Sequence, residues 1–187
     1  MEIVLYIDTC NKYMCVGLSK DDTLVYKKQY EAFKKQSEVA ALEIDKCLKE
    51  CNVKANELTK IVVTNGPGSY TGIRIGLTLA KVMSRVLNIK LVCLSSLQVM
   101  CGLDSKSAII DARGNRVYYG KYSNGNNVAY DCVKYISDLD LSEDYVGDTK
   151  VIDIEEKEID IIANMFDLRN SEEVRDIDSV KAIYLKD

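Results

Sequence analysis

The sequence predicts a mixed α/β protein in which one structural unit is duplicated, and three observations support this prediction. An apolar run that ends at Asp8 and a second that ends at Asp111 each predict a buried strand closed by an aspartate. A glycine follows each aspartate after nine residues, at Gly17 and at Gly120. The order strand, strand, strand, helix, strand, helix, strand occurs once in full and once in reduced form, which indicates internal duplication.

The first lobe is expected to span residues 1–103, and a second, smaller lobe is expected to span residues 104–187. We expect a mixed five-stranded sheet in the first lobe, with strands at Ile3–Ile7, Tyr13–Ser19, Thr23–Tyr30, Ile61–Thr64 and Lys90–Leu94. The first three of these strands are expected to form an antiparallel meander. The expected helices run from an N-cap at Ser37 to about Cys51, from an N-cap at Thr71 to about Asn88, and from Ser95 to Met100.

The second lobe is expected to repeat this plan with fewer elements. Its expected strands are Ile109–Asp111, Arg116–Tyr122, Val128–Val133, Tyr145–Val146, Val151–Ile152 and Ile183–Leu185. One helix is expected from about Glu156 to Leu168, because Ile159, Ile162 and Phe166 would share one of its faces.

A glycine-rich stretch, NGPGSYTGIRIG, occupies residues 65–76 and joins a strand to a helix. Its glycines have the wrong spacing for a dinucleotide fingerprint, and it lacks the lysine of a Walker phosphate loop. The free backbone N–H groups at such a helix start can bind an anion or a closely packed backbone. Alternatively, the stretch is only a tight connection between strand and helix and binds no ligand. The turn is expected to be shaped by Gly66, Pro67, Gly68, Ser69, Tyr70 and Thr71.

The helix after this turn is apolar on nearly all sides, so it must be covered on more than one side. The cover is either another helix of the same chain or a partner protein. Two glycines four residues apart predict a smooth patch that another helix can approach, and Gly76→Arg is expected to prevent pairing while the lobe stays folded. The candidate partner interface is Val39, Leu42, Gly72, Ile73, Arg74, Gly76 and Leu77.

The composition excludes several classes of enzyme. The chain has no histidine, so it cannot build a Ser-His-Asp triad, a Cys-His pair or an HExxH zinc site. Its seven cysteines lie mostly in apolar patterns, as in a reduced cytosolic protein. Residues 1–103 carry a net charge of +4 and residues 104–187 one of −8, so the first lobe suits a polyanion better, although a solvated surface explains +4 equally well. No apolar run approaches the roughly 18 residues of a membrane span, and no secretory signal is expected.

The glycine-rich stretch closely resembles the signature of the TsaB (YeaZ) family. The segments VLYIDT, IDARGNRVYYGKY and AIYLKD also resemble family segments and come in the expected order. The duplicated unit with aspartate-ended strands is similar to the ribonuclease H-like, actin-like (ASKHA) fold. The resemblance implies a non-catalytic scaffold in the making of N6-threonylcarbamoyladenosine next to the tRNA anticodon.

The resemblance also implies the partners. These are the catalytic paralogue TsaD, bound through the helices of the first lobe, the ATPase TsaE, and tRNA reached through the complex. A homodimer is expected for the chain alone, in the cytoplasm and without membrane contact. No catalytic residue, metal site or cofactor of its own is expected, apart from an adenine nucleotide at the interface with TsaD.

One position separates this chain from nucleotide-binding members of the superfamily. Those proteins usually carry a glycine between the aspartate and the threonine, whereas here Thr9 follows Asp8 directly. A hairpin backbone without that glycine is poorly suited to hold phosphate. The alternative function is a stand-alone nucleotide-binding phosphotransferase that uses Asp8 and Asp111 as cleft carboxylates, with magnesium.

Overall fold

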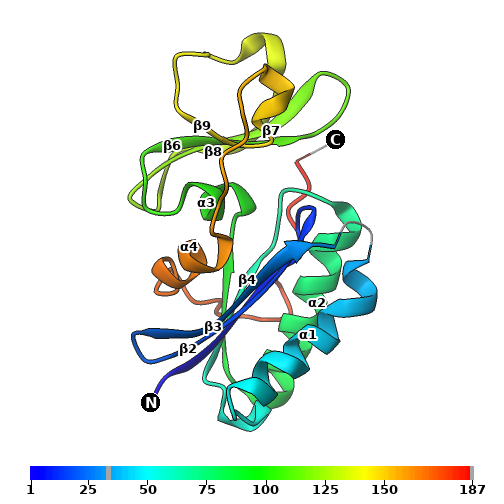
Figure 1. The fold of residues 1–187 in the computed structure, drawn as a ribbon, viewed down its shortest axis with the longest axis vertical. Coiled ribbons are helices and arrows are strands. Elements are labelled where there is room, and N and C mark those ends of the chain that lie inside the picture. The colour runs from blue at the N-terminus through cyan, green and yellow to red at the C-terminus, as the bar shows by residue number, and fades with distance from the viewer. Residues whose placement is uncertain (33–34, 186–187) are drawn as a thin grey trace.

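The computed structural model describes residues 1–32 and 35–185, and it shows two β-sheets stacked one above the other with helices on both sides of the lower one (Figure 1). The last two residues of the AIYLKD segment lie outside the described residues. Within them, no helix is both long enough and apolar enough to cross a membrane.

The first sheet has five strands in the order β3-β2-β1-β4-β5. The strands are β1 (Ile3–Asp8), β2 (Tyr13–Lys20), β3 (Thr23–Glu31), β4 (Lys60–Thr64) and β5 (Lys90–Leu94). β1, β2 and β3 form an antiparallel meander, and β4 and β5 run parallel to β1. The expected mixed five-stranded sheet is confirmed. β1 and β4 are buried along their whole length, because both faces of the sheet are covered.

The two faces of this sheet pack into different cores. Helices α1 (Gln36–Glu50) and α2 (Tyr70–Leu87) cover the face that carries Leu5 and Ile7. Helices α3 (Ser96–Cys101) and α4 (Ile161–Asp167) cover the face that carries Val4 and Tyr6. The second core continues into the upper sheet, so the two sheets share one apolar layer.

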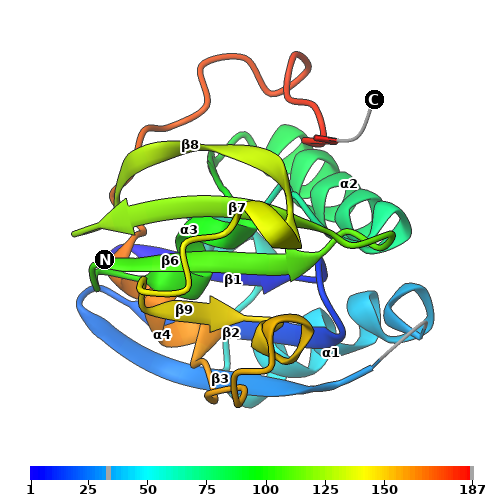
Figure 2. The same cartoon turned by 90° about the horizontal axis from the view of Figure 1, so that it is seen from above.

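The second sheet has four strands in the order β8-β7-β6-β9, seen from above in Figure 2. The strands are β6 (Lys106–Asp111), β7 (Arg116–Ser123), β8 (Asn126–Tyr135) and β9 (Tyr145–Gly147). Its outer face is covered by a small apolar cluster that includes Leu139 and Ile152. Together the two sheets confirm a duplicated α/β fold of the actin-like type.

Several expected elements differ from the structure. Val151–Ile152 belongs to a short 3-10 helix, Thr149–Ile152, and not to a strand. Residues 183–185 form no strand; the N–H of Ile183 donates to the carbonyl of Asn65 in the glycine-rich turn. The expected helix at 156–168 begins only at Ile161, because Asp160 caps it by accepting from the N–H of Ala163, and residues 156–160 have no regular secondary structure.

The expected N-caps of the two long helices are also wrong. α2 begins after Ser69, whose hydroxyl accepts a hydrogen bond from the N–H of Gly72, so Thr71 lies inside the helix. α1 begins at Gln36, one residue before Ser37, and its first position has no side-chain cap. The Gln36 side chain instead donates to the carbonyl of Asn11, which ties the start of α1 to the β1–β2 turn.

The chain returns to the first sheet after leaving the second. We call residues 170–185 the C-terminal strap. It runs past β5, where the N–H of Val174 donates to the carbonyl of Leu91, and then along α2. Its apolar residues Val174, Ile177, Val180 and Ala182 pack on the core beneath α1 and α2. The expected division into lobes at residues 103 and 104 stays a prediction.

Candidate functional site

The glycine-rich turn packs against the chain where β1 ends. The N–H of Ser69 donates to the carbonyl of Cys10 over 2.7 Å. A Cβ atom added to Gly68 would lie 2.3 Å from that same carbonyl oxygen, and one added to Gly72 would lie 2.0 Å from the carbonyl oxygen of Thr9. Since real Cβ contacts are never that short, these two glycines allow the turn and the start of α2 to touch the β1–β2 turn directly.

Thr9 fixes α2 in this position with one hydroxyl group. Its Oγ1 donates to the carbonyl of Gly72 over 2.7 Å and accepts from the N–H of Gly76 over 3.1 Å. A Cβ atom on Gly76 would lie 2.6 Å from that hydroxyl. The smooth patch predicted at Gly72 and Gly76 therefore faces β1 of the same chain. Gly76→Arg would disrupt the lobe itself and is not a clean test of pairing.

Two more candidate interface residues are covered by the chain's own core. Ile73 is 0% exposed and Leu77 is 5% exposed, and both face the sheet. The prediction that Ile73 and Leu77 form part of the partner interface is therefore wrong, because a helix side that is already buried cannot contact a partner. Arg74 and Leu42 are exposed, and Val39 is half-buried.

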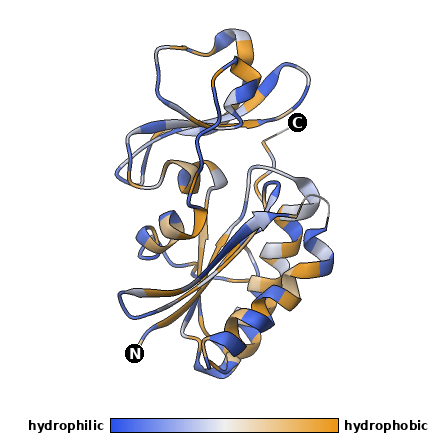
Figure 3. Cartoon of the chain, viewed as in Figure 1, coloured by the Kyte–Doolittle hydropathy of each residue, from blue (hydrophilic) through white to orange (hydrophobic). Residues whose placement is uncertain are grey.

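A different side of α2 carries apolar residues into solvent. Val82 is 55% exposed and Val86 is 77% exposed, and half-buried Ile75 and Leu79 continue the same helical row. We call these four residues the outer stripe. The neighbouring helix α1 adds Leu42, which is 58% exposed. Figure 3 shows hydrophobic residues on both helices, which lie on the side of the molecule away from the second sheet. The sequence predicted that α2 is apolar on nearly all sides, but it did not predict which of its apolar residues are exposed to solvent.

The C-terminal strap covers the third side of α2, along its polar residues. The ammonium group of Lys81 donates to the carbonyls of Asp178 and Val180 over 3.2 and 2.9 Å. Arg85 pairs with the carboxylate of Asp178 at 3.4 Å. The sheet, α1 and the strap thus cover α2 on three sides, and the outer stripe is the side that stays exposed.

Below the turn lies a fully buried polar cluster at the ends of β1 and β4. The hydroxyl of Thr64 and the N–H of Cys10 both donate to Oδ1 of Asp8. Asp8 Oδ2 and the hydroxyl of Ser96 have no hydrogen-bond partner within the described part of the chain. Burial raises the pKa of the Asp8 carboxyl, while the hydrogen bonds from Thr64 and Cys10 oppose that rise. Burial also raises the pKa of the Cys10 thiol, so it is a poor nucleophile.

This cluster does not fit a phosphate group or its metal ion. Asp8 is 1% exposed and already accepts two hydrogen bonds, and the turn at Gly68 covers the backbone of Cys10. The related aspartate Asp111 is exposed and accepts from the N–H of Arg113. The two aspartates therefore sit in unlike surroundings, and nothing in their geometry forms a phosphate cradle. Within residues 1–32 and 35–185, no group of three potential metal ligands occurs.

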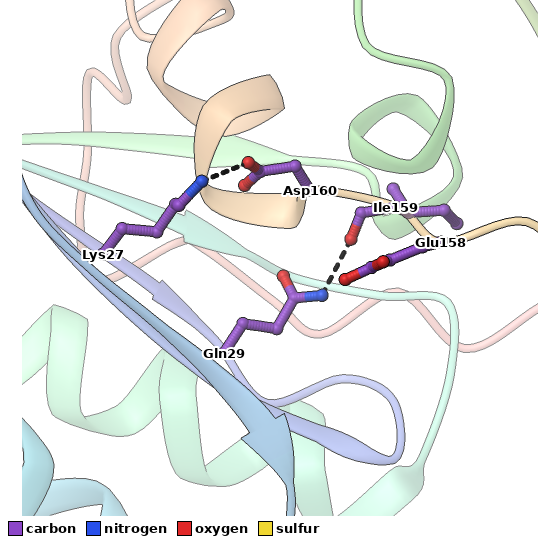
Figure 4. A pocket seen from close by; sticks show the side chains of 5 residues that line it. All are labelled: Lys27, Gln29, Glu158, Ile159 and Asp160. Atoms are coloured by element: carbon purple, nitrogen blue, oxygen red, sulfur yellow. Dashed lines mark hydrogen bonds and ion pairs between the residues drawn. The ribbon is translucent and has the colours of Figure 1, made fainter.

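An open hollow lies between β3 and residues 158–160, which lead into α4 (Figure 4). Gln29 of β3 donates through Nε2 to the carbonyl of Ile159 over 2.7 Å and accepts through Oε1 from the N–H of Ile161 over 3.0 Å. Lys27 forms an ion pair with Asp160 beside it. These polar contacts tie the segment before α4 to β3 of the first sheet.

The fold and these surfaces define an actin-like α/β protein with two stacked sheets and an exposed apolar helix face. The model of the family described as "TsaD: tRNA N6-adenosine threonylcarbamoyltransferase" matches residues 29–169, which is more than half of the chain. The chain therefore belongs to this family, and the resemblance to its TsaB (YeaZ) members is confirmed by the relatives below.

The tRNA threonylcarbamoyladenosine biosynthesis protein TsaB of Bacillus subtilis is 36% identical over 130 residues, which cover 67% of this chain and 57% of that protein. The TsaB protein of Buchnera aphidicola is 26% identical over 137 residues, which cover 69% of this chain and 64% of that protein. The chain thus spans less than two thirds of the length of both relatives.

Two solved structures from Pseudomonas aeruginosa share the fold. YeaZ superposes with a TM-score of 0.82 at 17% identity, covering 99% of this chain and all of the other. A protein described as similar to peptidase YeaZ superposes with a TM-score of 0.85 at 18% identity over the whole of both chains. Both similarities concern the fold alone.

Proposed function

We propose that this chain is a non-catalytic subunit in the biosynthesis of N6-threonylcarbamoyladenosine in tRNA. The family match and the TsaB relatives support the pathway. The buried Asp8, the covered turn and the lack of histidine support a role without chemistry of its own. The same features disfavour a stand-alone phosphotransferase that uses Asp8 and Asp111, and the missing histidine disfavours a histidine-based metallopeptidase. A complex that modifies tRNA works in the cytoplasm, which is where we place it.

The observation that carries this proposal is the outer stripe. An apolar row on a long helix, extended by Leu42 of α1, is the kind of surface on which another pair of helices packs. We propose that the catalytic paralogue TsaD docks there through its own helices, and that a second copy of this chain uses the same surface when the paralogue is absent. An adenine nucleotide would then lie at the interface with TsaD, and TsaE would join the assembled pair.

The test is gel filtration with light scattering, on this chain alone and mixed with its TsaD paralogue. A one-to-one complex is expected for the wild type. The double variant Val82→Asp, Val86→Asp should lose the complex, because docking would bury two unpaired carboxylates. Its thermal unfolding should stay unchanged, since both side chains face solvent.

A matched control is Val128→Asp, which changes a valine that is 59% exposed on β8 of the second lobe. It should leave the complex intact. A complex that survives the double variant would exclude the outer stripe as the docking surface. Separate elution of the two wild-type proteins would exclude the scaffold role.

A further inference from the structure

Two tyrosine rings and a guanidinium group lie together at the surface, where the C-terminal strap passes the start of α2. The ring centroids of Tyr70 and Tyr184 lie 5.0 Å apart with an interplanar angle of 30°. The guanidinium group of Arg74 lies 4.5 Å from the centroid of Tyr70. Tyr70 is 57% exposed, Tyr184 is 42% exposed, and Arg74 is exposed as well. We call these three residues the aromatic stack.

The charge of the aromatic stack is not neutralised. Among the described residues, Arg74 has no carboxylate partner, and the hydroxyls of Tyr70 and Tyr184 form no hydrogen bond. Lys81 and Arg85, which follow on the same side of α2, are both held by the strap. Arg74 therefore keeps its charge and its hydrogen-bond donors available for a ligand.

The aromatic stack is separate from the outer stripe. Tyr70 and Arg74 continue the row of Lys81 and Arg85, which runs beside the strap, whereas the outer stripe occupies another side of α2. A helical partner on the outer stripe does not need to cover these side chains. The aromatic stack thus needs an occupant of its own.

We propose that the aromatic stack binds an unpaired base of RNA. Every base has a π face that can stack on tyrosine rings, and arginine adds a cation that attracts the neighbouring phosphate. Tyr70 and Arg74 belong to residues 1–103, which carry a net charge of +4, whereas Tyr184 comes from the C-terminal strap. This inference rests on the proposed function, because that function supplies an RNA substrate, and it adds which side chains of this chain touch the RNA.

The test is fluorescence anisotropy with a labelled RNA stem–loop that has an unpaired loop, at one fixed salt concentration. It uses the full chain alone and mixed with its TsaD paralogue. Tyr70→Ala and Tyr184→Ala should each weaken RNA binding by about 5- to 150-fold, which is the usual loss when a stacking ring is removed. Tyr70→Phe should bind as the wild type does, because stacking uses the ring and not the hydroxyl.

The matched control is Tyr130→Ala, which removes a tyrosine that is 89% exposed on β8, and RNA binding should not change. Thermal unfolding of each variant checks that the protein stays folded. Unchanged RNA affinity in both alanine variants would overturn the proposal, and so would a lack of RNA binding by wild-type protein with and without the paralogue. If Tyr70→Ala weakens only the complex with the paralogue, the aromatic stack is a protein contact and the proposal is wrong.

The two proposals can fail separately. Loss of the scaffold role would appear as separate elution of this chain and its paralogue, whatever the RNA titration shows. Loss of the RNA contact would appear as equal affinities across the tyrosine variants while the complex still forms.

Discussion

Replacing Thr9 by valine should destabilise the protein through one lost hydroxyl group. Valine has nearly the same shape, but it cannot donate to the carbonyl of Gly72 or accept from the N–H of Gly76. Each buried hydrogen bond contributes about 1 kcal/mol to the free energy of unfolding, so the two together should cost about 2 kcal/mol. For a chain of this length, that loss corresponds to a drop of about 4–8 °C in the unfolding temperature.

The assay is urea-induced unfolding followed by circular dichroism, with calorimetry for the unfolding temperature. Thr9→Ser is the control, since it keeps the hydroxyl and loses one methyl group, and it should retain most of the stability. A free energy of unfolding for Thr9→Val within about 0.5 kcal/mol of the wild-type value would refute the reasoning, because the hydroxyl would then not hold α2 against β1.

Two further predictions concern the pH dependence of stability, through buried Asp8 and half-buried Glu143. Burial raises the pKa of the Asp8 carboxyl in the folded state, so the folded protein favours the neutral form of Asp8. The resulting stability is fully present below the pKa of Asp8 in the unfolded chain, and it is lost as the pH rises through the folded-state pKa. Asp8→Asn should therefore gain stability relative to the wild type as the pH rises from 4 to 7 in urea unfolding, and a constant difference would contradict this. Glu143 behaves in the opposite way: hydrogen bonds from Lys121, Ser107 and Tyr119 outweigh burial and lower its pKa to about 2. Its stabilising effect should be present above the unfolded pKa near 4.5 and be lost as the pH falls towards 2. Glu143→Gln should flatten that acid limb, and an unchanged acid limb would show that Glu143 does not contribute to it.

The sheet of the first lobe could be predicted from the sequence because its strands are short apolar runs between polar turns. Ile3–Ile7 and Ile61–Thr64 have no polar alternation, as expected for strands covered on both faces, and the structure buries both. Helix starts were less predictable. Ser69 and Thr71 are both acceptable N-caps, and only the position of α2 against Thr9 decides between them.

The strap could not be predicted because it has no regular pattern. Its apolar residues are spaced irregularly, and its contacts with α2 go mainly through its backbone carbonyls, which any residue can provide. For the same reason the sequence could not say which side of α2 is exposed. An apolar helix must be covered, but its pattern does not distinguish cover by a distant segment of the same chain from cover by a partner.

The signature glycines are best understood as parts of a support for α2. Gly68 and Gly72 bring the turn into contact with the backbone of Thr9 and Cys10, and Gly76 leaves room for the Thr9 hydroxyl. The sheet and the strap then hold α2 from two sides, so that Val82, Val86 and their row face outward in a fixed orientation. A rigid, pre-oriented surface loses less entropy on docking than a mobile one, which favours association. Substitutions in the turn should therefore impair function by displacing α2, even though no residue of the turn need touch a substrate.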